Sequence, residues 1–162
     1  MTLRKLAVCS AVALFSIVLS AQDQPALSNT PPSTYGQKLV TDTLAKHKDV
    51  VIMALHVTPP DQTDNVIVAS NIGRYGKKAD EDDLRVINTG ATNLEVNKTG
   101  NHFEVELPLL DQDGNRIGAA GIVFNYKAGD DKTKLQKKAE QVRDEMAKQI
   151  PSKDKLFEQV KQ

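Results

Sequence analysis

The residues best suited to hold a ligand are three cations that lie beside glycines: Arg74, Lys77 and Lys78, next to Gly73 and Gly76. Glycine lets backbone amides turn toward an anion, and arginine can bind a carboxylate through two hydrogen bonds. The same cations could instead neutralise the acidic run 80–83, where acidic groups suit a helix start. The pattern therefore predicts either an anion-binding loop or a salt-bridged helix start, and both readings stay open.

Three further side chains could contact a bound molecule. His56 is the one ionisable residue on an otherwise apolar segment, 50–57, and shares a face with Ile52 and Ala54. A histidine there serves either as a hydrogen-bonded core group or as a ligand contact. Tyr75 and Tyr126 could line a pocket with the ring and bond a ligand with the hydroxyl, or simply pack in the core.

Catalytic and metal chemistry have no visible basis in the sequence. His47, His56 and His102 lack the spacing of a zinc site, and no serine lies in a nucleophile elbow. The acidic residues gather at a helix start rather than as an isolated pair in apolar surroundings. We therefore expect no enzyme activity, no cofactor and no metal.

The N-terminus resembles an export signal. Arg4 and Lys5 precede an apolar run, 6–19, that ends in small residues. The run is shorter than the roughly 20 residues that a membrane span needs, so we predict a cleavable signal peptide over 1–20 and a bacterial periplasmic or secreted location. Cleavage would remove Cys9, the single cysteine, and leave a slightly acidic chain without a membrane span. The chain's 21 basic and 21 acidic residues give no electrostatic drive toward nucleic acid.

The remaining residues predict one α+β domain. Residues 21–33 are rich in Pro, Ser, Asn and Gln and are expected to be a disordered leader. Thr34 and Gln37 have capping-box spacing and open an amphipathic helix, and a second amphipathic helix is expected over 131–150. The five segments that read as strands are 50–57, 65–70, 93–97, 102–110 and 115–126. The domain is assigned to 34–128 and a C-terminal helical segment to 129–162, in which the role of 152–162 stays open.

Between the second and third strands we expect a short helix, with Asp80 as its cap, Leu84 and Ile87 facing inward and Gly90 at its end. The last two strands read as a hairpin, because Asp113-Gly114 supplies a turn between alternating segments.

In the first strand of that hairpin, Phe103 and the three apolar residues that alternate after it should face the core. Glu104 and Glu106 are then expected to face solvent. The small residues 118–121 of the second strand either allow a helix to approach closely or leave space for a bound molecule.

This order of segments resembles the single Cache (PAS-like) extracytoplasmic sensor domain. The resemblance rests on VIVASNIGRYGKKADEDDLRVINTG followed by FEVELPLLDQDGNRIGAAGIVF, with Ser70-Asn71 after a strand, a glycine loop, an acidic helix start and Ile117-Gly118 after a turn. It covers roughly 50–126. It implies a five-stranded antiparallel sheet with an N-terminal helix, a short lid helix and a C-terminal helix.

The resemblance also implies a small ligand held between the sheet and the 71–78 segment. The candidate contacts are Asn71, Arg74, Tyr75, Lys77, His56 and Tyr126. We therefore expect an exported module that binds a small polar or anionic molecule and has no output domain of its own. The alternative is a non-catalytic interaction module without a pocket, which serves an envelope receptor or transporter.

Overall fold

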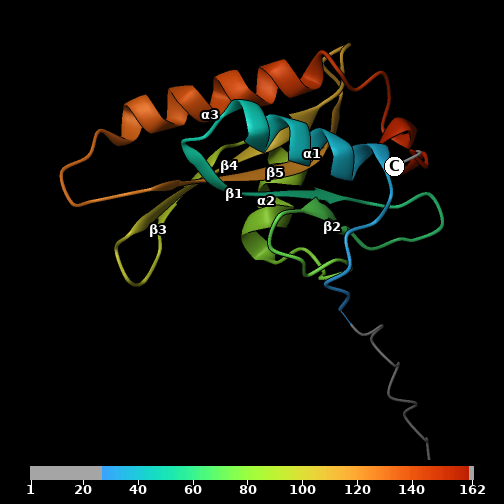
Figure 1. The fold of residues 1–162 in the computed structure, drawn as a ribbon, viewed down its shortest axis with the longest axis horizontal. Helices are drawn as coiled ribbons and strands as arrows, with labels where there is room; N and C mark the ends of the chain where they lie inside the picture. The colour runs from blue at the N-terminus through green and yellow to red at the C-terminus, as the bar shows by residue number, and fades with distance from the viewer. Residues whose placement is uncertain (1–26, 161–162) are drawn as a thin grey trace, which may run out of the picture.

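The computed structural model describes residues 27–160, which form a five-stranded antiparallel sheet with helices on both sides (Figure 1). The strands occur in the spatial order β2-β1-β5-β4-β3. Along the chain the elements are α1 (Tyr35–Lys46), β1 (Val50–Val57), β2 (Val66–Ser70), α2 (Glu81–Thr89), β3 (Asn93–Val96), β4 (His102–Leu110), β5 (Arg116–Asn125), α3 (Lys132–Ala147) and a 3₁₀ turn, η1 (Asp154–Phe157). The α+β, PAS-like architecture expected from the sequence is confirmed.

One face of the sheet is covered by α1 and α3 and forms the hydrophobic core (Figure 1). Phe103, Val105, Leu107 and Leu109 alternate along β4 and are all buried on this side. Since successive strand residues point to opposite faces, this alternation commits β4 to one apolar face and one polar face.

The two helices on this face are amphipathic, as expected. From α1 the core receives Leu39, Val40 and Thr43, and from α3 it receives Ala139, Val142 and Met146. Thr34 caps α1 by accepting from the Gln37 amide, but the Gln37 side chain bonds Ser70 instead of returning to the cap. The second half of the expected capping box is therefore used to hold α1 against β2.

The other face of the sheet is only partly covered, by α2 and by the loop 71–80. We call the loop 71–80 the lid. Asp80 caps α2 in a full capping box with Asp83, and Gly90 ends it in the left-handed conformation that glycine allows. The inward residues of α2 are Asp83 and Val86, whereas Leu84 is 40% exposed. The expectation that Leu84 faces inward is wrong, because the sheet contacts the helix along the Asp83–Val86 side.

Both ends of the described chain are tied to the domain. Ser28 and Tyr75 exchange two backbone hydrogen bonds, and the Arg74 amide donates to the Asn29 side chain. Part of the expected leader, 27–33, thus adds a strand-like segment to the lid. At the other end, Leu156 of η1 is buried and the Tyr35 amide donates to the Glu158 carbonyl, which gives the C-terminal segment a role in packing α1.

The predicted signal peptide lies outside the described residues. Within 27–160 no helix has the length and apolar character that a membrane crossing requires.

Candidate functional site

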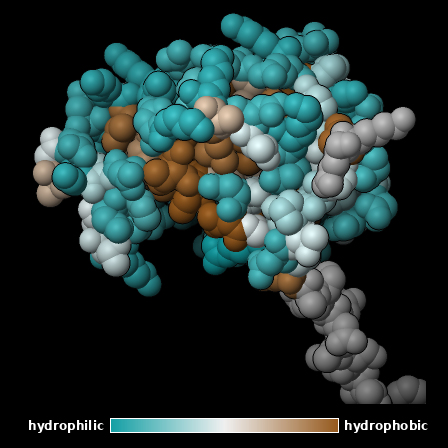
Figure 2. Space-filling view, viewed as in Figure 1, coloured by the Kyte–Doolittle hydropathy of each residue, from teal (hydrophilic) through white to brown (hydrophobic). Residues whose placement is uncertain are grey.

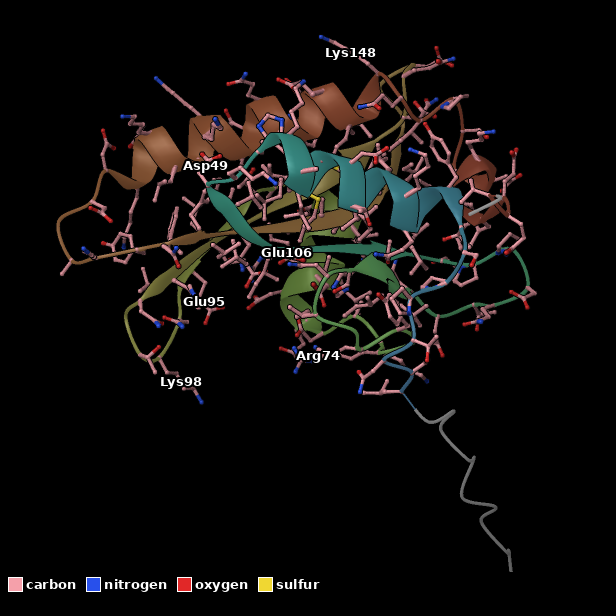
Figure 3. The ribbon with its side chains drawn as sticks, viewed as in Figure 1. Asp49, Arg74, Glu95, Lys98, Glu106 and Lys148 are labelled. Carbon is pink, nitrogen blue, oxygen red and sulfur yellow. The ribbon has the colours of Figure 1, made fainter. Side chains whose placement is uncertain are left out.

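A cavity of about 290 Å³ lies between the second face of the sheet and the lid. Its floor comes from β1, β4 and β5, and its walls come from β2, β3, the lid and the start of α2. Figure 3 shows three of its residues, Glu106, Glu95 and Arg74, which come from β4, β3 and the lid. The volume is near the lower end of the range for small-molecule sites, about 300 to 1,000 Å³.

The floor is open because small residues occupy its middle. Ala54 of β1 lies opposite Gly121 of β5, and Gly121 in turn lies opposite Glu106 of β4. No large side chain of β1 or β5 therefore rises from the sheet at this level, and the carboxyl end of Glu104 extends over Gly121. Of the two uses considered for the small residues 118–121, Gly121 leaves space over the sheet, where it lines the cavity.

The neighbouring level of the floor is apolar on one side and acidic on the other. Ile52 lies opposite Val123, and Val123 lies opposite Glu104, whose neighbour on β3 is Glu95. Two carboxylates directly opposite each other on one face repel. Burial raises the pKa of Glu104, and the negative charges of Glu95 and Asp83 raise it further.

Helix α2 brings a buried carboxylate down onto this floor. Asp83 Oδ2 lies 3.1 Å from His56 Nδ1, and both side chains are about nine-tenths buried. This is an ion-pair distance, although the His56 Nδ1 atom does not meet the angular requirement of a hydrogen bond. Burial by itself would raise the pKa of Asp83, but the close approach and the charge of His56, together with a hydrogen bond from Glu106, lower it overall. Asp83 is therefore the ionised member of the group.

Glu106 is the most unusual residue of the cavity. It is only 5% exposed, and within 27–160 no amide, hydroxyl or cationic group donates a hydrogen bond to it. Burial, together with its hydrogen bond to ionised Asp83 and the charge of Asp83, raises the pKa of Glu106 to about 9. One Glu106 oxygen can share the proton with Asp83, which leaves the other without a partner.

The cations predicted to bind a ligand lie at the rim of the cavity. The Lys77 ammonium is 3.5 Å from Asp80 Oδ2, as the salt-bridge reading anticipated. Lys78 is 2.8 Å from Asp64 and does not line the cavity. Arg74 lines the cavity and has a φ of +66°, a conformation that non-glycine residues rarely adopt. Among the described residues its guanidinium has no hydrogen bond or ion pair.

Three of the six predicted contact residues line the cavity, namely His56, Arg74 and Lys77. Asn71 instead extends the sheet, because its side chain accepts from the Met53 amide and donates to the Val51 carbonyl, both at 2.9 Å. Tyr75 is buried and donates to the Ser70 carbonyl. Tyr126 lies on the helical face, where its ring packs beside Phe103.

The sequence reasoning missed the acidic residues that define the site. Glu104 and Glu106 were expected to face solvent, but they face the cavity. Asp83 was considered only as part of an acidic helix start. The signal that could have found them was the alternation of β4, which puts both glutamates on the very face that the lid was expected to cover.

Among the residues that the structure describes, no three His, Cys, Asp or Glu side chains are arranged to hold a metal ion.

A second hollow, of about 210 Å³, continues along the same sheet face toward β3 and shares Ile52, Glu95, Glu104 and Val123 with the first. Figure 2 shows hydrophobic residues gathered near the start of β1, between α3 and α2, within a mostly hydrophilic surface.

No family model matches the chain, and no curated protein matches it. Solved structures that are similar to this chain include the following two. One is a double mutant of the PobR transcription factor inducer-binding domain from Acinetobacter, in complex with 3-hydroxybenzoic acid, with 10% identity, a TM-score of 0.42, and coverage of 72% of this chain and 95% of that one. The other is a domain of a putative IclR-family transcriptional regulator, with 13% identity, a TM-score of 0.42, and coverage of 76% and 97%. Similarity at this level carries no argument about function.

Proposed function

We propose that this chain is a PAS-like, Cache-type module that binds a small polar molecule between its open sheet face and its lid, and that it acts as a sensor or carrier. The observation that carries the proposal is the cavity around Glu106, where a nearly fully buried carboxyl group has an oxygen without a partner. Leaving such a group unpaired costs free energy, and a ligand that hydrogen-bonds to it removes that cost.

The lid supports this proposal in a second way. It holds Arg74 in an uncommon backbone conformation, and such outliers gather at binding sites where the surrounding structure enforces them. The Ser28–Tyr75 pairing and the Asn29 contact provide that enforcement from outside the lid. The apolar run near the N-terminus favours export, which would place the module in the periplasm or outside the cell.

Retained ligands and thermal stability test the proposal. We expect mass spectrometry of the purified chain to reveal a co-purifying small molecule, or a metabolite panel to raise its melting temperature. A ligand at one hundred times its Kd stabilises a protein by about 2.7 kcal/mol.

Gly121→Val should abolish this response, because the added side chain would enter the cavity. Ala128→Val adds the same kind of volume at an exposed turn outside the cavity and should leave the response intact. A folded Gly121→Val variant that binds as well as the wild type would contradict the proposed site.

The second candidate function is a protein-interaction module. It is favoured by Leu84 of α2 and Leu94 of β3, which are 40% and 45% exposed on elements joined by the Arg85–Asn93 hydrogen bond. A partner such as an envelope receptor or transporter would cover these side chains. Serine substitutions at both positions should then abolish co-purification of the partner without changing ligand-induced stabilisation.

A further inference from the structure

We propose that the ligand of this cavity is an organic cation, of the alkylammonium type, whose charged group occupies the space between Glu104 and Glu106. The inference rests on the proposed function, because it assigns a chemical class to the molecule that the cavity holds. The sequence had led us to expect a polar or anionic ligand, because the lid carries cations, and the proposed cation replaces the anionic part of that expectation.

The inference rests on how deeply the carboxyl groups and the cations lie in the cavity. Glu106 is 5% exposed and Glu104 is half-buried, and both project from β4 onto the floor. Arg74 is exposed, and Lys77 is at the rim and close to Asp80. The innermost ionisable group that a ligand meets without a cationic partner is therefore a carboxyl group. A buried carboxylate is stabilised by a partner of opposite charge.

The three aspartates of the cavity are already engaged. Asp83 faces His56 and takes part in the α2 capping box, Asp80 caps the same helix, and Asp82 is 2.8 Å from Arg85. Glu104 has no cationic neighbour of this kind, because the residue opposite it on β3 is a second glutamate, Glu95. A cation between Glu104 and Glu106 would relieve this repulsion and supply donors to the free Glu106 oxygen.

The surroundings favour an ammonium group with an apolar chain over a metal ion. Within the described part of the chain no three His, Cys, Asp or Glu side chains are grouped so that they could hold a metal ion. The remaining walls include Ile52, Ile67, Ile72 and Val123, which suit a short hydrocarbon. An ammonium group has three donors, which can reach carboxyl oxygens on different strands.

Binding should also displace a proton. The titratable and charged groups that line the cavity with Glu106 are Asp80, Asp82 and Asp83 of α2 and its cap, Glu104 of its own strand, Glu95 of β3, His56 of β1, and the rim cations Arg74 and Lys77. In the empty cavity the burial and negative neighbours of Glu106 hold a proton on it at neutral pH. A bound cation would take the place of that proton, so affinity for a cation should rise with pH up to about pH 9.

Three probes of equal chain length test the charge class: n-butylammonium, butyrate and n-butanol. Titration calorimetry should give n-butylammonium an affinity about tenfold to a hundredfold above that of n-butanol, and no binding of butyrate. Titrations in two buffers of different ionisation enthalpy should report release of about one proton per ligand at pH 7.

Glu106→Gln should lower the affinity for n-butylammonium at least about tenfold, because the amide matches the shape of the protonated carboxyl but cannot become an anion. Glu81→Gln is the matched control: it removes an exposed carboxylate of α2 that does not line the cavity and should change the affinity less than about twofold. Glu104→Gln provides a second variant on the same floor and should also weaken binding.

Preferential binding of butyrate, with affinity that falls as pH rises and is lost in Arg74→Gln, would overturn the cation assignment and leave the proposed function standing. Equal binding of n-butylammonium by the wild type and both cavity variants would also overturn it. Failure of all three probes, together with no retained molecule and no stabilising metabolite, would instead count against the proposed function itself.

Discussion

Replacing Glu106 by glutamine should make the protein increasingly more stable than the wild type as the pH rises from 5.5 to 7.5. Glu106 has a pKa of about 9 in the folded chain, against an ordinary value of 4.5. Between these values the folded state holds a proton that the unfolded state has lost, so the free energy of unfolding must fall as pH rises. Glutamine keeps a donor toward Asp83 without a proton to lose, so the Glu106 contribution to this pH dependence disappears.

The expected size follows from the width of the window. Between the two pKa values, the free energy of unfolding of the wild type falls by about 1.4 kcal/mol per pH unit relative to a variant that does not titrate in this range. From pH 5.5 to pH 7.5 the advantage of Glu106→Gln should therefore grow by roughly 3 kcal/mol. The Asp83 carboxyl does not enter this range, since its pKa is lowered and its contribution is lost only in strong acid.

Urea denaturation at pH 5.5, 6.5 and 7.5, followed by circular dichroism, measures the difference directly. Taking wild type minus variant at each pH cancels the titration of all groups that the two proteins share. Glu81→Gln, which removes an exposed carboxylate from α2, should run parallel to the wild type. Parallel curves for Glu106→Gln and the wild type would show that Glu106 titrates normally, and the account of the buried acidic floor would be refuted.

Two further predictions concern the sheet that carries the cavity. Gly118→Ala should destabilise the fold by about 1 to 3 kcal/mol in urea denaturation, because the added Cβ would lie 2.2 Å from the backbone oxygen of His56. Its control in the same strand is Gly121→Ala, whose Cβ meets only the mobile end of Glu104, at 2.7 Å, and which should cost far less. Asn71→Ala should cost about 1 to 3 kcal/mol, because the buried Met53 amide loses its acceptor, yet it should leave ligand-induced stabilisation unchanged. Asn88→Ala, at an exposed position of α2, is its control and should be neutral, while loss of binding in Asn71→Ala would return Asn71 to the site.

The architecture was predictable from local patterns. The ranges 50–57 and 102–110 coincide with β1 and β4, and the bounds expected for the other strands are within one residue at each end. Alternation of apolar and polar residues, together with turn residues, predicts these strands, because successive residues of a strand point to opposite faces of the sheet. The helix caps Thr34 and Asp80 were equally visible, since capping involves neighbours in the chain.

The site was predictable only in part. The sequence placed a ligand under the lid and selected His56, Arg74 and Lys77, which do line the cavity. Asn71 and Tyr75 are near it in the chain, but their polar groups complete the backbone hydrogen bonds of β1 and β2. Whether a lid residue faces a ligand or the sheet depends on the register between strands, which no local pattern states.

By itself the sequence determined the order of the strands and helices, their ends, and which side of each strand is polar, because these depend on residues a few positions apart. Only the tertiary structure decided what that polar side faces. It folded α2 back over β4, so that Asp83, Glu104 and Glu106, from segments some twenty residues apart, share one enclosed space. The charges of a cavity depend on which distant segments meet across it. Here the glutamates of β4 and Asp83 of α2 make the floor acidic, although the lid carries Arg74, Lys77 and Lys78.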